Sequence, residues 1–473
     1  MRVLFVATEV APFAKVGGLA DVAAALPRAL AELGVEVAVA LPKYRGVEGK
    51  AELTPHSRFS VPVAGEEKEC QVFQGNLPQT SVPVYFLSHD PYFDRAQVYG
   101  EGGGDYPDSL ERFTFLSRAA VALATQLGIE LLHVNDWHTA LVPVLLRAGE
   151  GPRRMKTVLT IHNLAYQGVF PWEQRTALGL PDRDMAVLKH AGKLNLLKGG
   201  ILTADLLTTV SPTYAREILE RGEGLEGYLR ARAGVLVGVL NGVDYTVWNP
   251  ETDPHLWANY SAQDLAGKAE NKRRLQQELR LEVTSDVPLV GMISRLAEQK
   301  GFDLVLEAFD RMMALGIQFV LLGTGDPRYE EFFRRTTSRR PQQATALITF
   351  SEQWAHRIEA AADILLMPSR FEPCGLNQLY SLRYGTVPVV RATGGLADTV
   401  LDFDPTTGKG NGFSFTDYTP EAMLGALRRA VELYRRDRRA WQELMIRGMR
   451  EDHSWGASAR EYLRLYQQLV GGA

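Results

Sequence analysis

Residues that can hold an anion or exchange protons with hydroxyl groups follow short apolar runs along the chain. In the first half, Lys15 and the pair Gly17–Gly18 follow RVLFVAT, Asp136 follows LLHVN, and His162 follows KTVLTI. In parallel α/β sheets, ligands bind at the carboxyl ends of the strands. The placement of lysine, glycine, carboxylate and imidazole directly after predicted strands therefore indicates one large polar site.

The second half of the chain repeats this arrangement. Lys300 follows VPLVGMIS, Glu372 lies between ILLMPS and a helix predicted to start near Gly375, and GGLAD, already present at 17–21, recurs at 394–398. Unpaired N–H groups at a helix start carry positive charge, and glycine lets an anion approach them closely. Both GGLAD copies are therefore candidates for phosphate binding, although a Gly-Gly pair also suits an ordinary β-to-α turn.

Alternating apolar strands and amphipathic helices must position these residues. A strand at 2–8, a helix at 19–34 and a strand at 35–42 form a predicted βαβ unit, which implies a parallel sheet. The pattern restarts near Val287 and includes a helix at 301–316. We predict an α/β fold of two doubly wound Rossmann-like domains that face each other across a cleft.

Chain length and composition support two domains of similar size. The 473 residues are 45% hydrophobic, which is enough apolar material for two cores. The stretch 239–260 has no hydrophobic periodicity and is interpreted as the hinge. We predict an N-terminal domain at 1–242, joined by a C-terminal helix at 456–473, and a second domain at 243–455.

Charge and cysteine content exclude several classes of partner. The formal net charge is −4 with no dense run of Lys or Arg, which argues against nucleic acid and acidic membranes. Glu9 interrupts the apolar N-terminus, and no stretch approaches the roughly 20 uncharged residues of a membrane span. Two distant cysteines predict reduced thiols rather than a metal cluster. These features predict a cytoplasmic protein.

Two nucleotide-binding alternatives fit the motifs poorly. A dinucleotide dehydrogenase needs G-x-G-x-x-G after its first strand and an acidic residue after its second, whereas this second strand ends in Leu41, Pro42 and Lys43. A P-loop kinase needs G-x-x-x-x-G-K-[ST], which is absent from the sequence. Neither class is favoured.

Several longer motifs resemble those of bacterial and plastid glycogen (starch) synthases of the ADP-glucose type. They span nearly the whole chain in order and are FAKVGGLADVAAALP, NDWHTALVP, TIHNLAYQGVF, LNGVDYTVWNP, SRLAEQKGFDL, SRFEPCGLNQLYSLRYGTVPVVRATGGLADTV and SWGASAREYLRLY. The resemblance implies a retaining GT-B glycosyltransferase that moves glucose from ADP-glucose to the non-reducing end of an α-1,4-glucan. The first domain would then hold the acceptor and the second the donor. The departures are Val16, where threonine is common, and Phe350, where tyrosine is common.

The resemblance also implies roles for individual residues. The implied catalytic residues are Glu372, Arg295, Lys300, Asp136 and His162. The implied substrate-binding residues are Lys15, Gly17, Gly18, Asp21, Asn241, Phe350, Cys374, Gly375, Leu376, Thr393, Gly394 and Gly395. Glu372 is expected to contact the donor glucose, His162 its 6-hydroxyl, and Phe350 the adenine ring.

Breaking a sugar–diphosphate bond releases a group whose negative charge must be neutralised. Arg295 and Lys300 can do this as fixed cations. The alternative is a divalent metal held by a D-x-D triplet, and such triplets occur at 182–184 and 402–404, both in irregular stretches. We expect the fixed cations to act, and therefore neither a metal nor another cofactor.

The expected partners are ADP-glucose and an α-1,4-glucan such as glycogen or maltooligosaccharide, with no nucleic acid and no membrane. A non-catalytic glucan-binding protein would be expected to have lost a charged residue of the site, and all are present. Epimerases and glycogen phosphorylases share the fold class, but a phosphorylase needs a cofactor lysine and a much longer chain. UDP-glucose stays open as the donor. If the two GGLAD loops sit on facing domains, they could clamp one diphosphate when the cleft closes.

Overall fold

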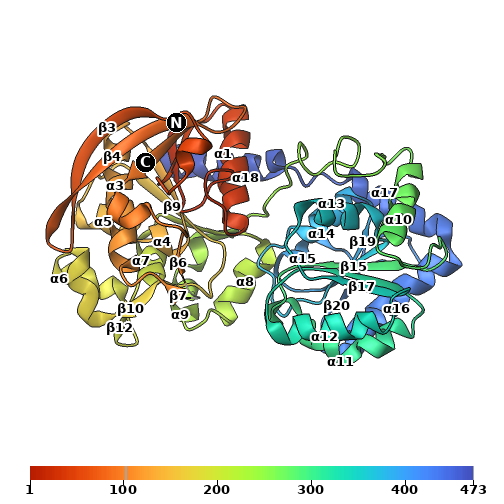
Figure 1. Cartoon of the computed structure of the whole chain (residues 1–473). Coiled ribbons are helices and arrows are strands. Elements are labelled where there is room, and N and C mark those ends of the chain that lie inside the picture. The colour runs from red at the N-terminus through yellow and green to blue at the C-terminus, as the bar shows by residue number, and fades with distance from the viewer. Residues whose placement is uncertain (102–103, 472–473) are drawn as a thin grey trace. The chain divides into compact units, whose positions relative to one another are not determined.

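The computed structural model describes residues 1–101 and 104–471, and these residues form two compact units (Figure 1). Unit 1 comprises Met1–Gly242 and Trp455–Ala473, and unit 2 comprises Val243–Ser454. Residues 472–473, the last two of the predicted C-terminal helix, lie outside the described residues. Each unit is built on its own sheet with parallel strands and packed helices, which confirms the prediction of an α/β fold of two Rossmann-like parts.

Unit 1 contains a mixed sheet with the strand order β14-β13-β9-β8-β1-β2-β5-β4-β3. Its strands are β1 (Arg2–Val6), β2 (Glu36–Pro42), β3 (Thr54–Val63), β4 (Glu66–Asn76), β5 (Pro83–Ser88), β8 (Leu131–Asn135), β9 (Lys156–Ile161), β13 (Leu206–Thr209) and β14 (Leu236–Gly238). Neighbouring strands from β14 to β5 pair in parallel, whereas β4 runs antiparallel to both β5 and β3. β1 is buried except for Arg2, as is typical of a strand covered on both faces.

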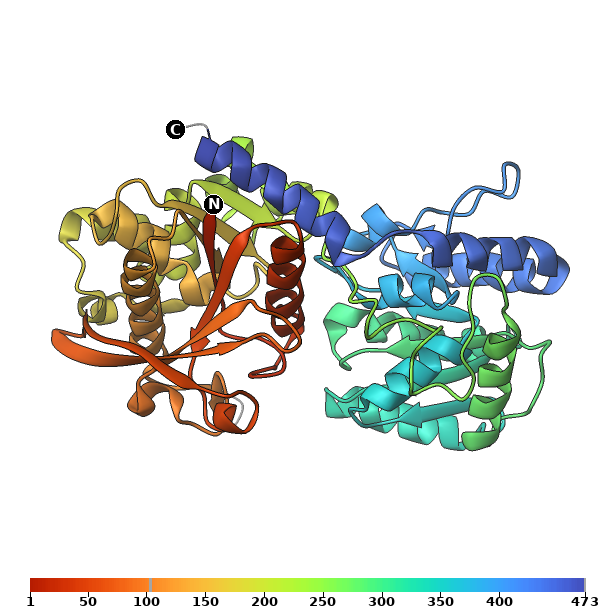
Figure 2. The same cartoon turned by 90° about the horizontal axis from the view of Figure 1, so that it is seen from above.

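Helices and short strands complete unit 1. The helices are α1 (Gly18–Glu32), α2 (Asp90–Phe93), α3 (Ser109–Gln126), α4 (Asp136–Thr139), α5 (Leu141–Ala148), α6 (Asp182–Met185), α7 (Leu196–Thr203), α8 (Pro212–Glu220), α9 (Glu226–Ala231) and α18 (Trp455–Gly471). The short strands are β6 (Gly100–Glu101), β7 (Gly104–Asp105), β10 (Val169–Pro171), β11 (Lys189–His190) and β12 (Lys193–Asn195). The last helix, α18, packs against α1 (Figures 1 and 2). None of the helices in the described residues has an apolar stretch long enough to cross a membrane.

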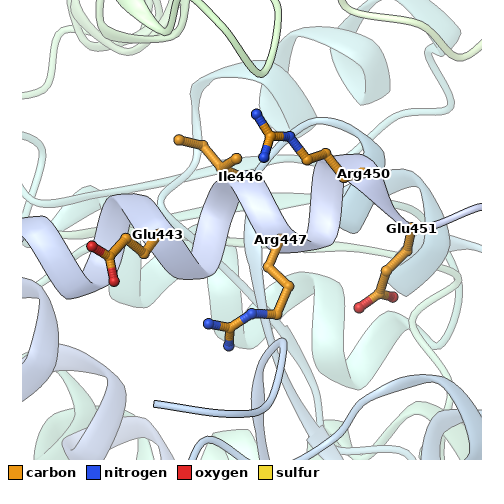
Figure 3. A pocket seen from close by; sticks show the side chains of 5 residues that line it. All are labelled: Glu443, Ile446, Arg447, Arg450 and Glu451. Carbon is orange, nitrogen blue, oxygen red and sulfur yellow. The ribbon is translucent and has the colours of Figure 1, made fainter.

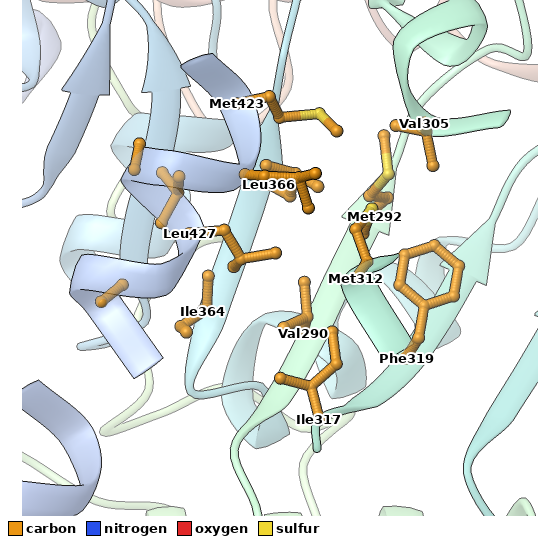
Figure 4. Close-up of a cluster of buried hydrophobic side chains, with 14 of the residues drawn as sticks. Val290, Met292, Val305, Met312, Ile317, Phe319, Ile364, Leu366, Met423 and Leu427 are labelled. Carbon is orange, nitrogen blue, oxygen red and sulfur yellow. The ribbon is translucent and has the colours of Figure 1, made fainter. Parts of the chain in front are cut away.

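Unit 2 contains a parallel sheet with the strand order β17-β16-β15-β18-β19-β20. The strands are β15 (Leu289–Ile293), β16 (Gln318–Leu322), β17 (Ala344–Leu347), β18 (Ile364–Met367), β19 (Val387–Arg391) and β20 (Phe413–Phe415). The helices are α10 (Ala266–Glu278), α11 (Phe302–Met313), α12 (Pro327–Ser338), α13 (Glu352–Ala361), α14 (Asn377–Arg383), α15 (Gly394–Thr399), α16 (Pro420–Arg436) and α17 (Arg438–Arg450). The main hydrophobic cluster joins Val290 and Ile364 of the sheet to Met312 of α11 and Leu427 of α16 (Figure 4).

Both sheets reverse their strand order beside the first strand. In unit 1, β1 lies between β2 and β8, and in unit 2, β15 lies between β16 and β18. At such a point the helices that follow the two strands lie on opposite faces of the sheet, and doubly wound folds bind ligands there. The topology therefore favours the loops after β1 and β8 in unit 1, and after β15 and β18 in unit 2, as ligand-binding positions.

Two local features add to the sequence-based expectations. The hairpin of β3 and β4 extends the sheet of unit 1 but carries little hydrophobic signal, because most residues of β3 are exposed or half-buried. The helix predicted to start near Gly375 begins two residues later, at Asn377. Gly375 has a φ of +73°, a left-handed conformation that ends the loop before the helix can begin.

A buried histidine ties the C-terminal helix to the sheet of unit 1. His133 in β8 pairs through Nδ1 with the Tyr466 hydroxyl of α18, and through Nε2 with Thr160 Oγ1 at 2.6 Å. Burial lowers the pKa of His133 to about 3, and His162 lowers it further whenever His162 is protonated. The folded protein therefore keeps His133 neutral at ordinary pH, with one ring nitrogen donating and the other accepting.

We expect the stability of unit 1 to fall in acid because of His133. The unfolded chain protonates this residue below about pH 6.5, whereas the folded protein keeps it neutral down to a pKa of about 3. Between these values the unfolded state binds more protons than the folded state. The free energy of unfolding therefore decreases as the pH is lowered, by up to about 1.4 kcal/mol per pH unit. Urea unfolding from about pH 7 to pH 4 should give His133→Gln a shallower slope than the wild type. If the free energy of unfolding of both proteins has the same slope against pH, His133 is not the source of the acid sensitivity.

Candidate functional site

The loops that follow β15 and β18 bring a cation and a carboxylate together in unit 2. Lys300 Nζ donates to Glu372 Oε2 at 2.6 Å, and Ser369 Oγ donates to the same oxygen at 3.0 Å. Glu372 is only 7% exposed, so these donors stand in for the water that its charge has lost. Lys300 and Glu372, both candidates from the sequence, are thus in direct contact.

Close backbone packing sets the distance between these two loops. Gly301 has a φ of +79°, and a Cβ atom there would lie 2.1 Å from the carbonyl oxygen of Pro368. The N–H of Arg370 also donates to the carbonyl of Gln299 at 2.8 Å. The glycine is therefore required for the approach that places the lysine beside the carboxylate.

The second GGLAD loop supports the backbone that carries Glu372. The Gly395 N–H donates to the carbonyl oxygens of Glu372 and Pro373, both at 3.1 Å. A Cβ atom on Gly394 would lie 2.0 Å from the carbonyl oxygen of Glu372, and one on Gly395 would lie 2.0 Å from that of Cys374. Both glycines therefore have a packing role that needs no ligand.

The other candidate residues of unit 2 near Glu372 lie in the turns before α14 and α15. Cys374 and Thr393 are buried, whereas Gly375 and Leu376 are half-buried. Gln378 Nε2 donates to the carbonyls of Cys374 and Gly375 at 3.0 and 2.9 Å and fixes the first turn. Gln378 and Ser369 were not predicted from the sequence, because glutamine and serine residues that support a neighbouring loop follow no sequence motif.

Arg295 and Phe350 are exposed side chains of unit 2. Arg295 lies in the loop after β15 that also carries Lys300. Phe350 lies between β17 and α13 and is 89% exposed. An aromatic ring that is not part of the core can stack on a planar ligand group. Both residues are therefore accessible to a ligand.

In unit 1, the loops after β8 and β9 form a second polar group. Asp136 Oδ1 accepts the backbone N–H of His162 at 2.8 Å, and His162 Nε2 pairs with Asn135 Oδ1 at 2.8 Å. Asp136 has a φ of +54°, a strained conformation for a residue other than glycine that is frequently found at functional positions. Asn241, another candidate, is buried in the segment after β14.

Hydrogen bonding defines the protonation of His162. Asn135 Nδ2 donates to the Val6 carbonyl at 3.0 Å, so its Oδ1 faces the imidazole and accepts from Nε2–H. Burial lowers the pKa of His162, which leaves the ring neutral with Nδ1 as an acceptor. Burial also raises the pKa of Asp136, against the backbone N–H groups of His162 and Asn163, which favour its charged form. The group can accept hydrogen bonds from the hydroxyl groups of a ligand.

The first GGLAD loop differs from the second. Lys15 Nζ pairs with Asp21 Oδ1 of α1 at 2.7 Å, and both side chains are exposed. A Cβ atom on Gly17 or Gly18 would meet nothing within 4 Å. The two copies therefore share a sequence but not an environment, and only the first leaves its glycines open.

The two acidic triplets have structural roles of their own. Asp402 forms an ion pair with Arg429 at 2.9 Å, and Asp404 accepts from Thr407 Oγ1 at 2.7 Å. Asp182 and Asp184 lie in the first turn of α6. Across residues 1–101 and 104–471, no group of three or more His, Cys, Asp or Glu side chains is placed to hold a metal ion.

A surface pocket of unit 2 lies on another element. Its lining residues belong to the C-terminal part of α17 and the residue that follows it (Figure 3), and they are Glu443, Ile446, Arg447, Arg450 and Glu451. Arg447 donates to the carbonyl of Gly410, and Glu451 accepts from Asn411 Nδ2. None of the lining residues comes from the loops after β15 and β18, so the pocket is separate from the candidate site.

Comparison with known proteins defines the class. The family described as "Starch synthase catalytic domain" matches residues 2–231, and the family described as "Glycosyl transferases group 1" matches residues 275–444. Sucrose-phosphate synthase from Thermosynechococcus elongatus has the same fold, with a TM-score of 0.63, 18% identity and 100% coverage of both chains. Two Rossmann-like units with polar groups after the switch-point strands are thus those of a GT-B glycosyltransferase.

Full-length relatives define the family. The glycogen synthase of Anaeromyxobacter dehalogenans (strain 2CP-C) is 52% identical over 484 residues, which cover 99% of this chain and 100% of the relative. That of Thermosipho africanus (strain TCF52B) is 46% identical over 99% of each chain. The catalytic domain of starch synthase IV from Arabidopsis thaliana, bound to ADP and acarbose, matches with a TM-score of 0.88 and 37% identity over 99% of each chain. This chain belongs to the glycogen and starch synthase family, as its motifs predicted.

Matched alanine substitutions in the two GGLAD loops should have different effects on stability. In Gly395→Ala, the new Cβ would lie 2.0 Å from a carbonyl oxygen, and we expect unit 2 to lose about 1–3 kcal/mol of stability or more. In Gly18→Ala, the Cβ meets nothing within 4 Å and alanine is the better helix former, so stability should change by less than about 1 kcal/mol. Urea unfolding measures both. Equal losses would contradict the packing explanation.

Proposed function

We propose that this chain moves glucose from ADP-glucose to the non-reducing end of an α-1,4-glucan, with retention of the anomeric configuration, in glycogen synthesis. The observation that carries the proposal is the contact of Lys300 and Ser369 with Glu372 after the switch-point strands of a glycogen and starch synthase family member. The reaction breaks the bond from the anomeric carbon to the diphosphate. It forms a bond from that carbon to the acceptor 4-oxygen, whose proton passes to the departing diphosphate.

Fixed cations are proposed to stabilise the departing diphosphate. Lys300 is half-buried and held in place, and Arg295 is exposed in the same loop. Cations that are already oriented need no reorganisation when negative charge develops. With ADP bound, Lys300 would share its charge between Glu372 and the diphosphate. This arrangement supports a reaction without a metal ion or another cofactor.

Glu372 is proposed to face the donor glucose. Its carboxylate is oriented through Oε2, and it can hydrogen-bond sugar hydroxyls or stabilise positive charge at the anomeric carbon. Cys374, Gly375 and Leu376 would complete the glucose pocket. The exposed ring of Phe350 would stack on adenine.

Unit 1 is proposed to supply hydrogen bonds to sugar hydroxyls. The neutral ring of His162 presents Nδ1 as an acceptor, which suits the 6-hydroxyl, and the carboxylate of Asp136 suits a neighbouring hydroxyl. Lys15, oriented by Asp21, would contribute positive charge, and Asn241 a further polar contact.

The acceptor is proposed to be glycogen or a maltooligosaccharide, and the protein is proposed to act in the cytoplasm without nucleic acid or membrane. The names of the relatives support the glucan, and the net charge of −4 supports the absence of a polyanionic partner. The presence of ADP in the Arabidopsis structure supports an adenosine nucleotide in the donor, with UDP-glucose as the alternative.

The proposed function is tested with purified protein, glycogen and either ADP-glucose or UDP-glucose in excess chelator. We expect glucose transfer to glycogen from ADP-glucose, because the cations that neutralise the diphosphate belong to the protein. The release of ADP and the lengthening of the glucan are measured together. Failure to lengthen the glucan with either donor refutes the function. Loss of activity in chelator, restored by magnesium or manganese, refutes the fixed-cation proposal alone.

Glu372→Gln should lower kcat by at least about 100-fold, because a preorganised charge at the reacting centre contributes roughly 3–4 kcal/mol. Unit 2 should stay folded with a modest loss of thermal stability, since Lys300 keeps contact with water and the amide oxygen can still accept from Lys300 and Ser369. Glu421→Gln is the matched control, because Glu421 pairs with Arg311 on the surface of unit 2. Ordinary turnover by Glu372→Gln would remove this carboxylate from the mechanism.

A further inference from the structure

A buried carboxylate lies beneath the loop that carries Lys15. Glu9 is only 3% exposed, and its Oε2 accepts the backbone N–H groups of Val16 and Gly17 at 2.5 and 2.7 Å. Its Oε1 accepts from the hydroxyl of Tyr99. One buried anion thus fixes two consecutive residues of the loop that begins α1, and both of its oxygens have donors.

The loop itself has little packing of its own. Lys15, Gly17 and Gly18 are exposed, Val16 is 60% exposed, and neither glycine would bring a Cβ atom within 4 Å of another group. A loop with so few contacts depends on its hydrogen bonds for a single conformation. The chain before it is held by the antiparallel bridge of Val10 and Ala14. The bonds to Glu9 extend this order to the residues next to Lys15.

Tyr99, which donates its hydroxyl to Glu9, is itself held in place. The Tyr99 hydroxyl also pairs with Thr8 Oγ1 at 2.9 Å, and its ring stacks on His138 at 4.9 Å between centroids. Arg112, which is fully buried, donates through Nη2 to the carbonyl of Val98 at 2.9 Å and so fixes the neighbouring backbone. Glu9 is therefore part of a buried network and not an isolated charge.

We propose that Glu9 is a positioning residue for donor binding, which holds Val16 and Gly17 so that Lys15 stays in place to meet the diphosphate. This inference rests on the proposed function, because it assumes that Lys15 acts on a nucleotide sugar. The N–H of Gly17 already donates to Glu9, so Gly17 contributes through its conformation. The cost of ordering the loop is met on folding, and the donor does not have to supply it on binding.

The experiment compares wild type, Glu9→Ala and Glu9→Gln, with Asp205→Asn as the matched control. Asp205 Oδ2 also accepts a backbone N–H and a hydroxyl, both from Thr157, at 2.8 and 2.9 Å. It precedes β13, at the edge of the sheet opposite to the loops after the parallel strands. Asp205 is exposed, whereas Glu9 is buried, so the control matches the hydrogen bonds and not the burial. Loss of a carboxylate that accepts a backbone N–H in unit 1 should affect stability at both positions, whereas a positioning role changes the loop and the ADP affinity only at Glu9.

Three measurements are made on each protein: amide hydrogen exchange of the peptide over residues 13–19, the dissociation constant for ADP, and kcat and KM with ADP-glucose. Glu9→Ala should speed the exchange and raise the dissociation constant and KM by about tenfold or more, because a freed loop must be ordered again by the ligand. The kcat at saturating donor should stay within about threefold, since Glu9 does not touch the reacting atoms. Glu9→Gln should recover part of the loss, because its amide oxygen can accept from Val16 and Gly17.

Unchanged exchange and unchanged ADP affinity in both Glu9 variants would overturn the proposal. A fall in kcat without a change in KM would also overturn it, because it would assign Glu9 to the chemical step. If Glu9→Ala does not fold, Glu9→Gln decides through the same exchange and affinity measurements. If wild type binds no ADP-glucose, the proposed function fails, and the exchange data still decide whether Glu9 orders the loop.

Discussion

The ion pair of Lys300 with Glu372 is the interaction on which the candidate site of unit 2 depends. Removing two charges from water is costly, and the cost is recovered only when they meet at hydrogen-bond distance with further donors. The 2.6 Å contact and the added donor Ser369 meet this condition. The contact in turn requires two loops from adjacent parallel strands, β15 and β18, to approach closely. Gly301 and the Gly394–Gly395 pair allow this approach at the level of the backbone.

The two units order the loops after their parallel strands by different physical means. In unit 2, bare glycine backbones pack against the carbonyl groups of the neighbouring loop. In unit 1, side chains hold the loops in place. Asn135 orients His162, and the buried carboxylate of Glu9 accepts the N–H groups of the two residues after Lys15. The shared GGLAD sequence therefore reflects the same β-to-α position in two sheets, with an open environment in one and a packed environment in the other.

The fold class and the strands that carry the site could be predicted from the sequence, because their apolar runs are short, uniform and followed by polar residues. The hairpin of β3 and β4 could not, since its exposed residues lack the signal of a buried strand. Lys300 and Glu372 were predicted as site residues, but their pairing could not be, because it depends on Gly301 lying against Pro368. Ser369, Asn135 and Glu9 act through other residues, and a sequence shows such partners only after the fold has brought them together.

In the proposed mechanism, Lys300 divides its charge between Glu372 and the diphosphate of the donor. A double-mutant cycle on ADP binding tests it, with calorimetric dissociation constants for wild type, Lys300→Met, Glu372→Gln and the double variant. Replacing Lys300 should cost about tenfold more ADP affinity when Glu372 is present, because a carboxylate left without its cation repels the diphosphate. The same loss in both backgrounds, within about 0.5 kcal/mol, would contradict it.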